Sequence, residues 1–97
     1  EIPYYIGRIA TVPYLPPGST ALARAVVDAM TGHDLAVMRN HGQVTVGRDF
    51  DHAIQNAVFF ELACRVLLEG GPRVRPLPAR RATELLALRN SRKGKNV

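Results

Sequence analysis

Three histidines are the residues of this 97-residue chain whose type most readily carries chemistry. His33 follows a glycine in a turn and His52 lies in the first turn of an expected long helix, so we interpret both as side chains without a functional role. His41 lies between two apolar runs. A neutral imidazole nitrogen is a favoured zinc ligand, but catalytic zinc needs about three protein ligands. Spacing alone therefore leaves two readings of His41, a loop histidine or a metal ligand.

Glu61 and Cys64 are the other candidates, and both lie in the expected long helix. Glu61 comes four residues after Ala57 and three before Cys64, so helical spacing points its carboxylate into an apolar stripe. A carboxylate in such a place must be hydrogen-bonded or paired with a cation. Two interpretations stay open, a pair with Arg65 at the edge of the stripe or a functional role. We expect Cys64 to be a small core residue.

A hairpin is the element expected to position His41. Residues 34–39 form a short apolar run typical of a strand buried on both faces, and residues 43–46 alternate with two valines on one face. His41 and Gly42 lie between the two runs, and a glycine can adopt a positive φ. The sequence predicts an antiparallel hairpin with His41 at its tip.

The remaining elements are predicted from caps and prolines. Two helix N-caps are predicted, because their side-chain oxygens can accept a backbone N–H of the first turn. They are a hydroxyl in the run Gly18-Ser19-Thr20 and the carboxylate of Asp49. Four prolines make residues 1–17 typical of extended edge segments and loop. The predicted elements are a helix over 20–31, a helix over 50–69, a loop over 72–78, one short helix over 80–89 and a frayed end over 91–97.

The net charge of +5 is unevenly distributed. Residues 1–71 hold five arginines and seven acids, a net charge of −2, and residues 72–97 hold eight basic residues and one acid, a net charge of +7. We divide the chain accordingly, into a folded part over 1–71 and a basic tail with one short helix over 72–97. The tail has no interleaved aromatic residues for base stacking, so we expect no nucleic-acid partner.

The rest of the composition narrows the protein class. No run reaches the roughly 18 apolar residues of a membrane span, so we expect no membrane partner. One cysteine excludes an internal disulfide and favours a reducing compartment, which we take to be the cytoplasm. The chain opens on Glu1 rather than methionine, so we expect a fragment or a processed subunit.

Several motifs in order resemble one family over about residues 2–70. They are Val12-Pro13-Tyr14, Pro17-Gly18-Ser19 before an alanine-rich helix, the run from Ala36 to the Asn40-His41-Gly42 tip, Val44-Thr45-Val46-Gly47, and Ala53 and Glu61 on the long helix. The chain resembles the C-terminal half of the class II aldolase and adducin-head family. The resemblance implies an α/β fold, as the C-terminal part of an α/β/α sandwich with a mainly antiparallel sheet.

The resemblance also implies a site. His41 inherits the role of the third ligand to Zn²⁺ or another divalent metal, with Asn40, Gly42 and Glu61 as candidate groups around it. The other ligands, the acidic base and the phosphate loop of the family lie upstream, so no catalytic residue and no further cofactor-binding residue fall in this span. We therefore expect the missing N-terminal half or a companion chain as a partner, within a homo-oligomer that is a tetramer in the family.

The resemblance implies a function in the same way. It points to a zinc-dependent lyase that acts on a small hydroxy-carbonyl or sugar-phosphate substrate and stabilises an enediolate, with this chain as an incomplete site. A family tyrosine that donates a proton near the C-terminus is missing here, because no tyrosine follows Tyr14. The alternatives are a decarboxylase or dehydratase on the same scaffold, or a non-catalytic adducin-like assembly module.

Overall fold

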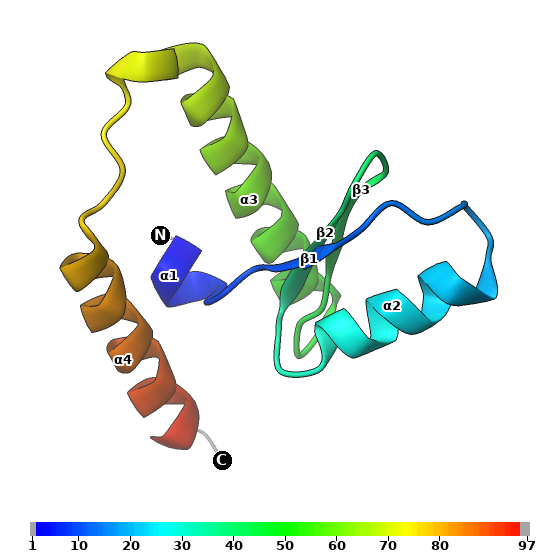
Figure 1. The fold of residues 1–97 in the computed structure, drawn as a ribbon. Coiled ribbons are helices and arrows are strands. Elements are labelled where there is room, and N and C mark those ends of the chain that lie inside the picture. Colours follow the sequence, from blue (N-terminus) through cyan, green and yellow to red (C-terminus); the bar gives the residue numbers. More distant parts are fainter. Residues whose placement is uncertain (1, 96–97) are drawn as a thin grey trace. The chain divides into compact units, whose positions relative to one another are not determined.

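The computed structural model describes residues 2–95, with side chains described through Arg92. It contains both helices and a sheet, so the predicted α/β class is confirmed (Figure 1). Two compact units make up the chain, one of residues 1–7 with 58–97 and one of residues 8–57. The elements in chain order are α1 (Ile2–Tyr5), β1 (Ala10–Val12), α2 (Thr20–Met30), β2 (Leu35–Met38), β3 (Gly42–Thr45), α3 (Phe50–Gly70), the 3-10 turn η1 (Gly71–Arg73) and α4 (Ala79–Lys95).

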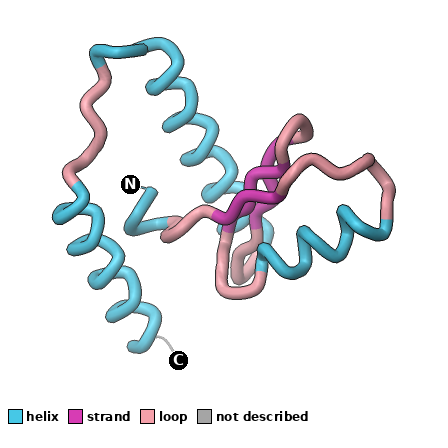
Figure 2. The backbone as a smooth tube through the Cα atoms, viewed as in Figure 1, coloured by secondary structure: helices cyan, strands magenta, loops and turns pink. Residues whose placement is uncertain are grey.

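A three-stranded sheet in the order β1-β2-β3 organises the unit of residues 8–57 (Figure 2). β1 pairs with β2 in parallel, with Val12 opposite Met38, and β2 pairs with β3 in antiparallel fashion. Val12, Leu35 and Ala36 are buried and form the apolar centre of this unit. The antiparallel hairpin and the edge position predicted for the N-terminal strand are both confirmed.

α2 lies against β1 and β2, and its start follows directly from the sequence. The hydroxyl of Ser19 accepts a hydrogen bond from the backbone N–H of Leu22 at 3.1 Å, which satisfies one of the free donors of the first turn. The chain leaves the helix through Gly32, whose φ of 77° suits a residue without a Cβ. The predicted helix over 20–31 is confirmed.

The first turns of α3 are fixed to β3 by polar side chains. Thr45 Oγ1 donates to the carbonyl of Ala53 at 3.0 Å, and Gln43 Nε2 donates to the carbonyl of Ala57 at 3.2 Å. The amide of buried Asn56 donates to the carbonyl of Val46 at 3.1 Å. The strand that follows the hairpin tip is therefore fastened to a helix over its whole length, which stiffens the tip.

At the start of α3, the backbone at Gly47 lies close to the first turn of the helix. Asp49 accepts from the N–H of His52 at 2.8 Å, as expected of a cap. A Cβ on Gly47 would lie 2.6 Å from the backbone nitrogen of Ala53 and 2.9 Å from His52 Nδ1. Only glycine therefore fits where the chain passes from β3 into the helix.

α1 and α4 pack together in the other unit, and both differ from the prediction. Residues 2–5 form a helical turn instead of an extended segment, because a proline at the second position of a helix loses no hydrogen bond. α4 extends to Lys95 instead of ending near 89, so the expected fraying of 91–95 is wrong. The prediction for residues 96 and 97 lies outside the described residues.

Arginines of α4 account for its added length. Arg89 Nη1 donates to the carbonyl of Tyr5 at 2.9 Å, and Arg92 contacts the hydroxyl and the ring of Tyr4. The hydrogen bond that Arg92 donates to the hydroxyl of Tyr4 raises the pKa of Arg92 above its ordinary value. These contacts join residues more than eighty positions apart, so part of the basic tail is a helix that packs against the first turn of the chain, while most of its described arginines are exposed.

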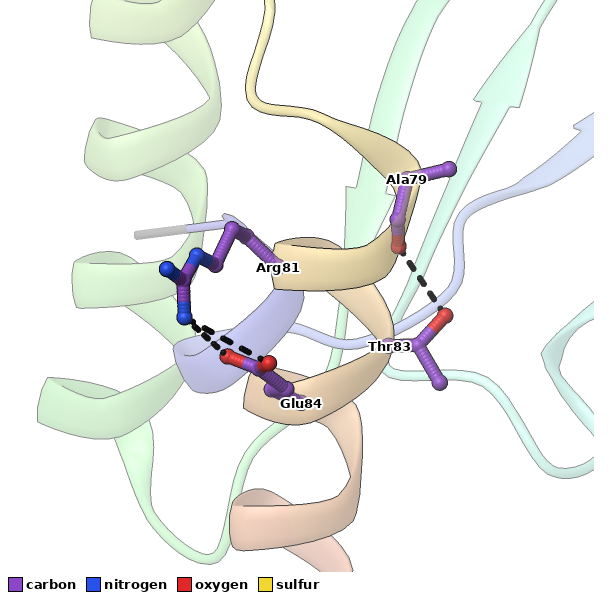
Figure 3. A network of polar contacts seen from close by, with 4 residues as sticks. All are labelled: Ala79, Arg81, Thr83 and Glu84. Atoms are coloured by element: carbon purple, nitrogen blue, oxygen red, sulfur yellow. Dashed lines mark hydrogen bonds and ion pairs between the residues drawn. The ribbon is translucent and has the colours of Figure 1, made fainter.

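Local polar contacts hold the start of α4. Arg81 Nη1 pairs with Glu84 Oε2 at 3.1 Å, and the hydroxyl of Thr83 donates to the carbonyl of Ala79 at 3.0 Å (Figure 3). Both side chains of the ion pair are more than half exposed, so it contributes little to stability.

No helix in the described part of the chain is both long enough and apolar enough to cross a membrane.

Candidate functional site

The hairpin tip that carries His41 is a three-residue loop. Arg39, Asn40 and His41 connect the strands, and Gly42 belongs to β3, where it pairs with Met38. The predicted connection of His41 and Gly42 is thus wrong in detail. Asn40 adopts the left-handed φ of 66° that the turn requires, a conformation that asparagine tolerates better than most residues. Gly42 is therefore not needed in the turn and forms the first residue of β3.

The backbone of the tip is fixed at several points. The N–H of His41 donates to the carbonyl of Met38 at 3.1 Å, which closes the turn. Gly42 has a φ of 148°, a conformation that side-chain-bearing residues rarely adopt. On the other side of β2, the N–H of Arg39 donates to the carbonyl of Val12 at 3.0 Å. The end of β1 therefore lies beside the start of the loop.

The imidazole of His41 is exposed and has two partners from the segment that follows β1. Its Nε2 lies 3.1 Å from the carbonyl oxygen of Leu15. The ring of Tyr14 stacks on it, with 5.8 Å between the ring centroids and 5° between the planes. The parallel pairing of β1 with β2 brings these residues together, because it places the exit of β1 beside the tip. The sequence gives no sign of this role for Tyr14, because no local pattern links residues 27 positions apart.

The other two histidines have local partners. His52 Nδ1 accepts from the N–H of Arg48 at 3.1 Å and so helps to cap α3. His33 Nδ1 lies 3.2 Å from the carbonyl of Thr31. Neither is placed beside His41 by any contact in the described residues, and both fit the structural interpretation given to them.

Glu61 lies on α3 at the predicted helical spacing, and its side chain is exposed rather than buried. The neighbouring Val58 and Leu62 are exposed as well. Ala57 and Cys64, which lie on the same face of α3 as Glu61, are half-buried. Arg65, the expected partner, pairs with Glu69 at 3.0 Å.

One side chain of this site, the imidazole of His41, has the chemistry of a metal ligand. Imidazole nitrogen suits zinc and several other divalent metals. A metal-binding histidine commonly donates its second ring nitrogen to a carbonyl, which is the arrangement of His41 and Leu15. No group of three or more His, Cys, Asp or Glu residues within the described residues could hold a metal ion. The chemistry of His41 therefore fits one metal ligand, and the described residues do not form a complete metal site by themselves.

Comparison with known proteins decides the family. The family described as Class II Aldolase and Adducin N-terminal domain matches residues 1–68, which is most of the chain. The chain belongs to this family. The resemblance of the hairpin tip and the following helix to class II aldolases is thereby confirmed.

Solved structures of family-like proteins give the same result. The chain is similar to YgbL from Escherichia coli (26% identity, TM-score 0.82), over 88% of this chain and 42% of that chain. It is also similar to YgbL from Klebsiella pneumoniae (28% identity, TM-score 0.81), over 87% and 41%. YgbL is described provisionally as an aldolase, epimerase or decarboxylase. No curated protein matches the chain. The chain thus spans less than half the length of these neighbours.

Proposed function

We propose that this chain supplies one metal ligand to a zinc-dependent lyase of the class II aldolase type. The observation that supports the proposal most is the imidazole of His41, exposed on a stiffened hairpin tip with one ring nitrogen bonded to a carbonyl. Membership of the family supports the same role. Asn40 and Gly42 shape the tip, and Glu61 is proposed as a positioning group of the complete site.

The proposed substrate is a small hydroxy-carbonyl compound or sugar phosphate. Zinc, when bound, supplies a Lewis acid that stabilises negative charge on the oxygens of such a substrate. His41 would hold the metal through one imidazole nitrogen, and the hairpin restrains that imidazole. Decarboxylation and dehydration also place negative charge beside a carbonyl. Decarboxylation is among the activities proposed for the similar protein YgbL, which supports a decarboxylase as the second candidate.

The remaining ligands are proposed to come from outside residues 1–97. The similar structures are more than twice as long as the part this chain matches, so they contain polypeptide that can supply them. That polypeptide is either a further part of the same protein or a companion chain, within a homo-oligomer. The single free cysteine fits a reducing compartment such as the cytoplasm.

Metal content tests this proposal. The complete polypeptide that contains residues 1–97 is purified and its zinc is measured by elemental analysis, beside His41→Ala and the matched control His33→Ala. We expect about one zinc per chain in the parent and in His33→Ala, and a loss of more than nine-tenths of it in His41→Ala. Circular dichroism checks that all three proteins are equally folded.

The opposite result identifies the non-catalytic alternative. A well-folded parent protein without zinc or another divalent metal, unchanged by His41→Ala, contradicts the lyase and favours an adducin-like assembly module.

A further inference from the structure

The hydrogen bond to Leu15 determines which nitrogen of His41 carries the proton. A backbone carbonyl oxygen can only accept, so Nε2, which lies 3.1 Å from it, must be the N–H donor. A neutral imidazole has one N–H, and the lone pair therefore lies on Nδ1. No described residue hydrogen-bonds Nδ1, so this nitrogen is the one left for a ligand.

Tyr14 restricts the same ring by a different contact. The two rings are nearly parallel, 5° apart, at a centroid distance within the range of stacked aromatic pairs. A quarter-turn of the imidazole about its bond to Cβ would end the stack, and a half-turn would move Nε2 away from the carbonyl of Leu15. Tyr14 and Leu15 are consecutive, so one short segment holds the ring at its face and at its edge.

The sheet fixes this segment relative to the tip. Val12 lies opposite Met38 in the parallel pair, and the N–H of Arg39 continues the ladder to the carbonyl of Val12. Two residues beyond Val12 the chain reaches Tyr14, and three beyond Met38 it reaches His41. The contact thus follows from strand register and is not an accident of two mobile loops.

We propose that Tyr14 is a positioning residue that, with the carbonyl of Leu15, holds His41 so that Nδ1 is presented to the metal. The inference rests on the proposed function, because it assigns a task to Tyr14 only if His41 is a ligand. It adds to that function the nitrogen used and the residue that orients it.

Nuclear magnetic resonance tests the nitrogen. In the complete polypeptide with ¹⁵N-labelled histidine and no metal, long-range ¹H–¹⁵N correlations are recorded above about pH 8, where imidazole is neutral. We expect His41 in the Nε2–H tautomer, and His41→Asn identifies its signals by their loss. A dominant Nδ1–H tautomer would overturn the assignment.

Zinc affinity tests the role of Tyr14. Zn²⁺ alone is titrated against a chromophoric competitor into the parent, Tyr14→Leu and Tyr14→Phe. We expect Tyr14→Leu to weaken binding about tenfold, as loss of an outer-shell partner does, and Tyr14→Phe to stay within about twofold of the parent, because it keeps the ring. Tyr5→Leu, in the other unit, is the control for loss of a tyrosine.

The outcomes separate this inference from the proposed function. If zinc binds through His41 and Tyr14→Leu binds it as tightly as the parent, the positioning role is wrong and the lyase proposal survives. If the parent binds no zinc, the proposed function fails and the positioning role fails with it, although the tautomer measurement still reports on the ring.

Discussion

Asn40 is the residue on which the shape of the tip depends most. Its φ of 66° lies in the left-handed region, which costs a residue with a branched Cβ roughly 1–2 kcal/mol. Glycine adopts the same conformation without that cost. The structure thus gives Asn40 a backbone role that precedes any contact with a ligand.

Two substitutions at this position separate backbone from side chain. We expect Asn40→Val to lower the free energy of unfolding by about 1–2 kcal/mol, and Asn40→Gly to change it by less than about 0.5 kcal/mol. Urea unfolding of the complete polypeptide measures both. Equal losses in the two variants would show that the amide, and not the turn, stabilises the tip. Zinc affinity lost in Asn40→Gly at unchanged stability would instead give the amide a direct part in the site.

At the scale of elements, the caps were predictable and the long-range contacts were not. Ser19 and Asp49 begin α2 and α3 as their residue types predict, because capping depends on neighbours three positions away. The extension of α4 depends on Arg89 and Arg92 reaching the first turn of the chain. Tyr14 reaches His41 only through the register of β1 with β2, which no local pattern contains.

Arg89 is the residue expected to hold α1 against α4. It is half-buried, it donates to the carbonyl of Tyr5 at 2.9 Å, and a Cβ on Gly7 would lie 2.8 Å from its Nε. A charged hydrogen bond contributes about 1.5–3 kcal/mol, so Arg89→Ala should loosen the turn it contacts. We expect amide exchange at Ile6 and Gly7, whose N–H groups bond the carbonyl of Ile2, to accelerate about tenfold or more.

A matched arginine on the same helix provides the control. Arg81 pairs with exposed Glu84 and should leave those two amides unchanged when replaced by alanine. Equal acceleration in Arg81→Ala and Arg89→Ala would mean that helix content, and not this contact, protects the turn.

At the scale of the whole molecule, the chain leaves much apolar surface uncovered. In the unit of residues 1–7 with 58–97, Val58, Leu62 and Val66 recur every fourth residue on α3 and are each more than half exposed. Residues at this spacing lie on one face of a helix. The similar structures contain more than twice the matched length, which is consistent with further polypeptide covering such a face.

When that polypeptide is absent, the exposed apolar face of α3 can be covered by the same face of a second copy of the 97-residue chain. We expect the isolated chain to self-associate with rising concentration in sedimentation velocity. Burying a half-exposed leucine contributes about 1 kcal/mol, so Leu62→Lys should raise the midpoint concentration about fivefold. Gln55→Lys adds the same charge at an exposed polar position of α3 and should leave the midpoint unchanged. A chain that stays monomeric at every concentration would show that this face needs no cover.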